Sequence, residues 1–326
     1  MGLSKPTGPC FNAHYEMAGV RLRLPELLPL AFFTYTVFLG WSWDLETAQL
    51  RSLVLVAVLA GFMTWAFAWA ELHWRPRLFN IARDWLPLAL VPVAYIEMAN
   101  FTVSEGPTVY EHSWLAWDRM VLDAWGLRRI IESLGPVIPA LLEVCYALIY
   151  ALPGTALAIL YFERKRDRVD QFLFTFVGGC LITYSLFPLF PSQPPRFVFP
   201  GEDLPGVHTV FREFNLWWLE RANIWTSVFP SGHVTAAFGV ALGLRRALPE
   251  RPWLGRAFLA MAFAVWVATF YGRYHYLVDG LAGMAVSLLS ARWTARLARR
   301  GYFAQPELLP EALPALEPQG ETRRLV

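Results

Sequence analysis

Two histidines stand at corresponding ends of two apolar segments of this chain. His233 follows the Pro-Ser-Gly of residues 230–232, and His275 comes four residues before Asp279. A carboxylate one helical turn after a histidine can accept a hydrogen bond from the ring, which fixes the tautomer and raises the basicity of the other nitrogen. His275, His233 and Asp279 are therefore candidate catalytic residues. A His–Asp pair that merely joins two helices is the non-catalytic alternative.

Several residues near these histidines could hold an anion such as phosphate. Ser231 and Gly232 begin a predicted helix, whose free N–H groups and positive dipole end attract anions. Arg196, which follows two prolines, and Arg273 offer guanidinium groups for forked hydrogen bonds. A plain loop-to-helix junction and contacts with lipid headgroups are the alternatives for these residues.

The composition is that of a membrane protein. Of the 326 residues, 56% are apolar and only 17% are charged, and the apolar residues form blocks of roughly 20, the length that a helix needs to cross a bilayer. The net charge of +2 is too small to indicate nucleic-acid binding. The 3 cysteines make no disulfide framework and the other histidines are scattered, so we expect no bound metal and no cofactor.

We expect an all-α, polytopic membrane bundle of about eight transmembrane helices. Between the predicted spans, 20 of the 28 Lys and Arg residues fall on one side and 8 on the other. The positive-inside rule makes the first side cytoplasmic, which places both termini in the cytoplasm and both histidines on the extracytoplasmic face of a bacterial-type inner or plasma membrane. The predicted spans are residues 25–43, 51–71, 85–101, 137–162, 171–190, 230–248, 254–271 and 276–296.

Two stretches outside these spans have the pattern of helices that lie in the membrane interface. Residues 102–136 carry three tryptophans and a periodic charged segment, and residues 211–220 combine aromatic with charged side chains. The tail from about residue 305 is rich in proline and glutamate and is predicted to be disordered.

Three blocks of sequence resemble the motifs of the type 2 phosphatidic acid phosphatase superfamily, membrane branch. They are Pro-Pro-Arg at 194–196, Pro-Ser-Gly-His at 230–233, and the segment 271–283, which contains both His275 and Asp279. The first and third blocks are most similar to the branch of inositol phosphorylceramide synthase. The resemblance implies a six-helix core at residues 84–300, with two additional transmembrane helices at 25–83. An N-terminal cytoplasmic segment (1–24) and a C-terminal tail (301–326) complete the expected division.

The resemblance also implies a role for each candidate residue. His275 is the nucleophile that forms a phosphohistidine, and Asp279 orients it. His233 is the acid that protonates the leaving alkoxide and then the base that activates the attacking hydroxyl. The residues implied to bind the phosphate oxygens are Arg196, Ser231 and Gly232.

Two cations of the superfamily pattern are missing from this chain. The first motif usually has a lysine several residues before its arginine, whereas the lysines here are Lys5 and Lys165, both predicted to be cytoplasmic. The third motif usually has an arginine six residues before its histidine, where this chain has Thr269. We hypothesise that Arg273 supplies part of the missing charge.

The predicted function is that of a metal-independent phosphatase or phosphotransferase acting on lipid phosphates, with water or an alcohol such as inositol as acceptor. The expected topology places Glu97 and Glu143 near the depth of the histidines, and Tyr184 and Gln193 could join them at a headgroup or acceptor site. A purely structural polar network is the alternative for these four residues. For the whole chain, the alternatives are a membrane transporter and an intramembrane serine protease using Ser231.

Overall fold

The computed structural model describes residues 15–17, 19–102, 110–222, 224, 226 and 228–303 of the chain. It confirms the all-α class, apart from one hairpin that we did not predict, in which β1 (Tyr15–Met17) pairs antiparallel with β2 (Val20–Leu22). The predicted disordered tail from residue 305 and most of the expected N-terminal segment lie outside the described residues.

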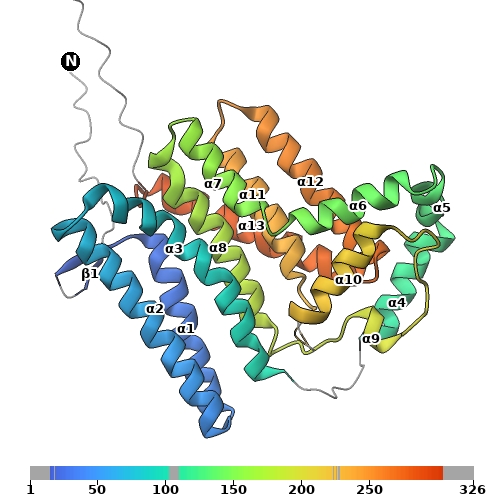
Figure 1. Cartoon of the computed structure of the whole chain (residues 1–326), viewed down its shortest axis with the longest axis horizontal. Helices are drawn as coiled ribbons and strands as arrows, with labels where there is room; N and C mark the ends of the chain where they lie inside the picture. The colour runs from blue at the N-terminus through green and yellow to red at the C-terminus, as the bar shows by residue number, and fades with distance from the viewer. Residues whose placement is uncertain are drawn as a thin grey trace, which may run out of the picture.

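Each predicted span coincides with one helix or with a pair of helices (Figure 1). They are α1 (Leu24–Ser42), α2 (Thr47–His73), α3 (Pro76–Glu97), the pair α6 (Val137–Leu148) and α7 (Leu152–Phe162), α8 (Val169–Leu186), α11 (Gly232–Ala247), α12 (Pro252–Tyr271) and α13 (Leu277–Arg299). The largest difference from prediction is at α3, which begins earlier, at Pro76, because a proline is favourable in the first turn of a helix.

Within the described residues, four helices are long and apolar enough to cross a membrane, namely α1, α2, α8 with the turn before it, and α12. The pair α6–α7 makes a fifth if it is counted as one broken span. The remaining three do not meet that measure, since α11 has only 16 residues while α3 and α13 contain charged residues such as Asp84 and Asp279. The chain is thus an integral membrane protein, and the full count of eight spans stays a prediction.

The break between α6 and α7 has a local cause. Pro153 has no backbone N–H, so the carbonyl of Ile149 cannot receive its helical hydrogen bond, and the proline ring clashes with that carbonyl. The helix therefore stops after Leu148, restarts at Leu152, and bends by 71° between the two. Tyr150 lies in the resulting elbow.

The helix α8 is the centre of the bundle and packs against α1, α3, α11 and α13. Small residues let the helices approach closely, as is common inside membranes. Hydrogen bonds between hydroxyl groups then join the helices: Thr183 of α8 lies 2.9 Å from Thr235 of α11, and Thr175 of α8 donates to Thr294 of α13 at 3.0 Å. These contacts fix α11 and α13, which carry the motif residues, against one helix.

Charged residues join the bundle at one end. Arg23, before α1, forms ion pairs with Asp84 of α3 and with Asp170 of α8. Arg168, before α8, pairs with Glu250 in the loop between α11 and α12 at 2.8 Å. The loops predicted to be cytoplasmic therefore gather at one end of the molecule, while His233 and His275 lie at the opposite ends of their helices.

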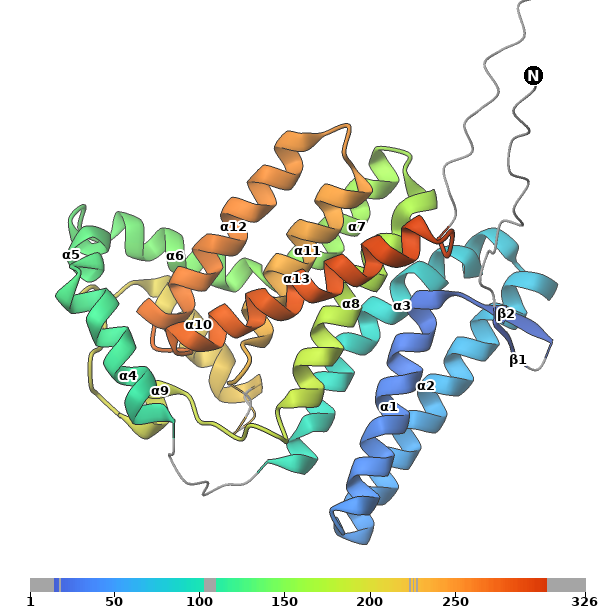
Figure 2. The same cartoon turned by 180° about the vertical axis from the view of Figure 1, so that it is seen from behind.

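The remaining helices cover the end that carries the histidines. They are α4 (Glu111–Arg119), α5 (Leu127–Glu132), α9 (Pro195–Val198) and α10 (Val210–Ala222), with short 3-10 or π turns at Met98–Phe101 and Met120–Ala124. A further 3-10 turn, Arg166–Arg168, lies at the opposite end, before α8. Seen from both sides, α4, α5 and α10 lie far from the α1–α2 pair (Figures 1 and 2). The two segments expected to be interfacial are thus helical, and α10 packs on α6.

Candidate active site

Both histidines are placed by the beginnings of two neighbouring helices, α11 and α13. The backbone N–H of Ser231, the residue before α11, donates to the backbone carbonyl of Asp279 in α13 at 2.9 Å. Gly283 permits this approach, because a Cβ at that position would lie only 2.6 Å from the carbonyl oxygen of Ser231. Direct backbone contact between two helix starts therefore brings His233 and His275 together.

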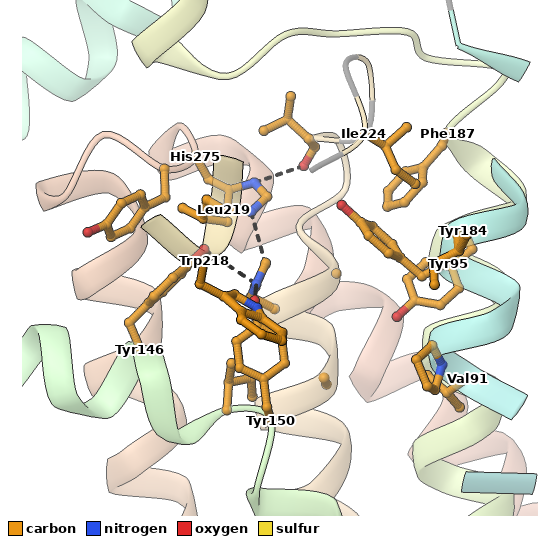
Figure 3. Close-up of a pocket in the computed structure, with 18 of the residues that line it drawn as sticks. Val91, Tyr95, Tyr146, Tyr150, Tyr184, Phe187, Trp218, Leu219, Ile224 and His275 are labelled. Atoms are coloured by element: carbon orange, nitrogen blue, oxygen red, sulfur yellow. Dashed lines mark hydrogen bonds between the residues drawn. The ribbon is translucent and has the colours of Figure 1, made fainter. Parts of the chain in front are cut away.

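The two imidazole rings face each other across a hydrogen bond. His233 Nδ1 lies 3.3 Å from His275 Nε2, and Figure 3 shows His275 between this contact and a second one to a backbone oxygen. That oxygen belongs to Val228, 3.2 Å from His275 Nδ1, and Asp279 Oδ2 lies 3.5 Å from the same nitrogen. A carbonyl and a carboxylate only accept, so Nδ1 carries the proton and Nε2 presents its lone pair.

His275 is suited to act as a nucleophile because it stays neutral. Its side chain is buried, and this burial together with the positive charge of Arg196 lowers the pKa of His275 to about 3. The Val228 carbonyl, which would favour the charged ring, does not reverse this effect. At neutral pH the lone pair on Nε2 is therefore available for attack.

His233 has different partners on its second nitrogen. Its Nε2 lies 3.1 Å from the Tyr150 hydroxyl and 3.3 Å from the Tyr146 hydroxyl, and the Tyr146 ring stacks on the imidazole with centroids 4.9 Å apart. A hydroxyl both donates and accepts, so these partners are compatible with either protonation state of His233. His275 Nδ1, by contrast, has only acceptors around it, which fix its proton. This difference favours His233 as the residue that exchanges protons and His275 as the residue that attacks.

Both histidines border a cavity of about 670 Å³ (Figure 3). The cavity is polar near the histidines, where Gly232 and Arg196 line it, and Arg196 donates to the backbone oxygen of Tyr274 at 3.3 Å. Its remaining wall is mostly apolar and comes mainly from α3, α8 and α10, with Pro153 at the start of α7. Residues of this apolar wall include Leu88, Val91, Pro92, Pro153 and Phe176.

Two predicted phosphate-binding residues do not line the cavity. Ser231 is completely buried, and its Oγ accepts a hydrogen bond from the N–H of Val234, as the N-cap of α11. Arg273 is buried as well, and its Nη1 donates to Asp118 Oδ2 at 3.1 Å. Arg273 has a positive φ of 64°, and its side chain is held against α4 rather than in the cavity. A phosphate contact by Arg273 would therefore require the ion pair with Asp118 to break.

Asp118 of α4 is a functional candidate that the sequence reasoning did not single out. Its Oδ1 accepts from the backbone N–H of Leu277, the first residue of α13, while its Oδ2 pairs with Arg273. The two contacts flank His275, with Arg273 on the loop before it and Leu277 at the start of α13. Burial raises the pKa of the Asp118 carboxyl to about 7, in opposition to the Leu277 N–H and the Arg273 charge, which lower it.

We expect Asp118→Ala to lower turnover by about 10-fold or more, because the loop of His275 loses a charged contact and a helix cap. Asp118→Asn resembles the protonated carboxyl and retains an acceptor for Leu277, so its loss should be smaller. Asp123→Asn is the matched control, since Asp123 pairs with Arg128 on the surface. Initial rates in detergent, with thermal unfolding measured in parallel, test this. Equal rates for Asp118→Ala and Asp123→Asn would contradict it.

The four candidate headgroup residues divide into two groups. Tyr184 lines the cavity beside Gly232. Glu143 is buried in a network instead, where it accepts hydrogen bonds from Asn215 at 2.7 Å and from the Tyr274 hydroxyl at 2.6 Å. Glu97 is buried on α3 and Gln193 lies near Glu111, and neither of them lines the cavity. The structural alternative therefore fits Glu143 best.

The main residues missed by the sequence reasoning are the cavity tyrosines Tyr95, Tyr146, Tyr150 and Tyr274, together with Arg212, which pairs with Glu143 at 3.2 Å. Of the four tyrosines, Tyr274 lies in the third sequence block but was given no role, and the other three lie outside the three blocks. One signal was present for Tyr150, because a tyrosine three residues before a proline inside a predicted span marks a place where the helix opens.

Comparison with known proteins identifies the class. A model of the PAP2 superfamily matches residues 117–293, so the chain belongs to the PAP2 superfamily. Enzymes of this superfamily are phosphatases and phosphotransferases. The resemblance deduced from the three sequence blocks is thereby confirmed.

Two relatives are similar to this chain. A PA-phosphatase related-family protein of Dictyostelium discoideum is 29% identical over 128 residues, which are 37% of this chain and 22% of that protein. The chain thus matches only about a fifth of the length of that relative. The phosphoinositol dihydroceramide synthase of Bacteroides thetaiotaomicron is 22% identical over 272 residues, 75% of this chain and 82% of that protein. Comparison with solved structures gives no match.

Proposed function

We propose that this protein is a membrane phosphatase or phosphotransferase that cleaves a lipid phosphate ester through a phosphohistidine on His275. The observation that carries the proposal is the pairing of a neutral His275 with His233 at 3.3 Å, beside Arg196 and a largely apolar cavity. An apolar cavity next to an anion-binding group suits a lipid with a phosphate headgroup. Membership of the PAP2 superfamily supports the same reaction class.

In the first step of the proposed mechanism, the phosphoryl group takes the place of the hydrogen bond between the two histidines. His275 Nε2 attacks the phosphorus, a nitrogen–phosphorus bond forms, and the bond from phosphorus to the lipid alcohol breaks. The proton on His233 Nδ1 moves to the leaving alkoxide. Asp279, 3.5 Å from His275 Nδ1, stabilises the positive charge that develops on the attacking ring.

In the second step, water or an alcohol attacks the phosphohistidine. His233 Nδ1 takes the proton of the attacking hydroxyl, the new phosphorus–oxygen bond forms, and His275 is released with its lone pair restored. The Gly232 amide and Arg196 bind the phosphate oxygens, and Ser231 contributes by holding the start of α11 in place.

The proposed setting is a bacterial-type inner or plasma membrane with about eight spans, cytoplasmic termini and an extracytoplasmic site. The gathering of the basic loops at the end opposite the histidines supports this orientation. In this proposal α3, α11 and α13 also span the membrane, although each is too short or too charged to meet the measure for a membrane span. They would do so as inner helices of the bundle, because their charged side chains are paired or face the site. The serine-protease alternative loses support because the Ser231 hydroxyl caps its own helix.

Arg196→Ala should reduce kcat/KM for a lipid phosphate by about 10²-fold, because a charged donor to the transferred phosphoryl group is lost in a partly desolvated site. Arg196→Lys keeps the positive charge but loses the forked pair of hydrogen bonds, so its kcat/KM should lie between those of Arg196→Ala and the wild type. Steady-state rates over a range of substrate concentrations test this. A loss in Arg196→Ala of less than threefold, with the fold intact, would remove Arg196 from the phosphate site.

The experiment that tests the proposed function uses purified protein in detergent with a phospholipid radiolabelled in its phosphate, with and without inositol or a ceramide. Release of water-soluble label means hydrolysis, and a new labelled lipid means transfer. The name and coverage of the Bacteroides relative favour transfer, with a phosphoinositol group as the cargo to try first. If neither product forms, and His275→Ala binds the same lipids as the wild type, the proposal fails.

A further inference from the structure

We propose that Tyr150 is a positioning residue for the acid–base histidine: its hydroxyl, delivered by the elbow between α6 and α7, holds His233 Nε2 so that Nδ1 faces the reacting phosphoryl group. The inference rests on the proposed function, because it assigns His233 to proton transfer. It explains why a predicted span is broken beside the site.

The geometry of the elbow carries this inference. An unbroken helix through residues 137–162 would keep the Tyr150 backbone in the helical ladder, whereas Pro153 ends that ladder between Leu148 and Leu152. Tyr150 leaves the elbow toward the cavity, where its hydroxyl lies 3.1 Å from His233 Nε2 (Figure 3). Its ring meets the rings of Trp218 and His233 edge to face, which limits its rotation.

A hydroxyl is the partner that the proton cycle of His233 requires. When His233 is doubly protonated, Nε2 donates to the Tyr150 oxygen while Nδ1 gives its proton to the leaving alkoxide. When Nδ1 takes a proton from the acceptor alcohol, the same Nε2–H bond remains. If Nε2 is bare in the empty enzyme, the hydroxyl turns and donates instead. A carboxylate at this position would hold the ring in its charged form and oppose proton release.

Tyr146 and Tyr150 contribute differently to the position of His233. Tyr146 is buried and stacked between His233 and Tyr274, with ring centroids 4.9 and 4.3 Å away, so it fixes the plane of the imidazole. Tyr150 approaches the ring from its edge, and its hydroxyl makes the shorter of the two contacts with Nε2, at 3.1 Å against 3.3 Å for the Tyr146 hydroxyl. Loss of the Tyr150 hydroxyl should therefore misdirect the proton while the ring stays in place.

The test compares leaving groups in a single turnover of Tyr150→Phe. One substrate is the phospholipid that the wild type cleaves, and the other is the p-nitrophenyl ester of the same phosphoryl group. Departure of the lipid alkoxide needs the proton of His233, whereas p-nitrophenolate leaves without one. We expect cleavage of the lipid to slow by about 10-fold, the effect of one lost hydrogen bond at a reacting group, and release of p-nitrophenolate to change less than twofold.

Two further variants complete the design. His233→Ala should show the same selectivity with a larger loss. Tyr35→Phe is the control, because it removes a hydroxyl that donates to the Ser185 carbonyl at 3.1 Å outside the cavity, and it should cleave both substrates like the wild type. Equal losses on the two substrates in Tyr150→Phe, or no loss on either, would overturn the inference. If the wild type cleaves neither substrate, the proposed function itself fails.

Discussion

His275→Ala should abolish turnover of every lipid phosphate substrate, with a loss of about 10⁴-fold or more, because it removes the atom that forms the bond to phosphorus. The residual rate would come only from binding and from the remaining phosphate contacts. The direct measurement is the covalent intermediate: wild-type protein incubated with labelled substrate and quenched in alkali should retain protein-bound label of phosphohistidine, and His275→Ala should retain none.

Comparison with a second histidine variant separates attack from proton transfer. His233→Ala should still accumulate labelled protein from a substrate with a good leaving group, because the attacking nitrogen is intact. His73→Ala is the control, since His73 stacks on Trp69 at the far end of α2. Label that persists in His275→Ala at the wild-type level would show that another residue is the nucleophile.

Asp279→Asn should lower kcat on the order of 10³-fold while leaving the fold nearly intact. The asparagine oxygen can still accept from the Tyr276 N–H, as Asp279 Oδ2 does at 2.8 Å, so the start of α13 keeps its cap. What is lost is the negative charge 3.5 Å from His275 Nδ1, which stabilises the ring as it becomes cationic. Single-turnover rates and thermal unfolding in detergent measure the two effects separately.

The outcome of Asp279→Ala sharpens this prediction. That variant loses both the charge and the cap, so it should be less stable to heat than Asp279→Asn and at least as inactive. A loss in Asp279→Asn of less than tenfold, with unchanged unfolding, would mean that the carboxylate serves only to begin α13.

The helices and the meeting of the two histidines could be predicted from sequence, because both depend on local signals. Apolar blocks of spanning length marked the helices. The motifs placed His233 at the start of one segment and His275 just after the end of the next, with a short basic turn joining the two segments. Antiparallel helices in a membrane necessarily bring such ends to one face. The family resemblance then added their roles, which stay predictions until they are tested.

The direction of individual side chains could not be predicted in this way. Glu143 was expected near the depth of the site, but its side chain is held by Asn215 and Tyr274 and does not line the cavity. Arg273 was expected at the phosphate, and its partner Asp118 stands 155 residues earlier in the chain, on a helix whose docking no local pattern reveals. Tyr150 reaches His233 only because a helix is broken next to it.

The ion pairs of Arg23 join the N-terminal part of the chain to the rest of the bundle. The expected boundary between the additional helices and the six-helix core falls at residue 84, and Asp84 itself pairs with Arg23, which also reaches Asp170 in the central helix. Asp84 is 1% exposed and has a second cation, Arg166, at 2.8 Å, so its charge is balanced from the N-terminal segment and from the core together. Residues on both sides of the expected boundary thus share one buried carboxylate, so a change at Arg23 or at Asp84 would be felt in both parts of the molecule.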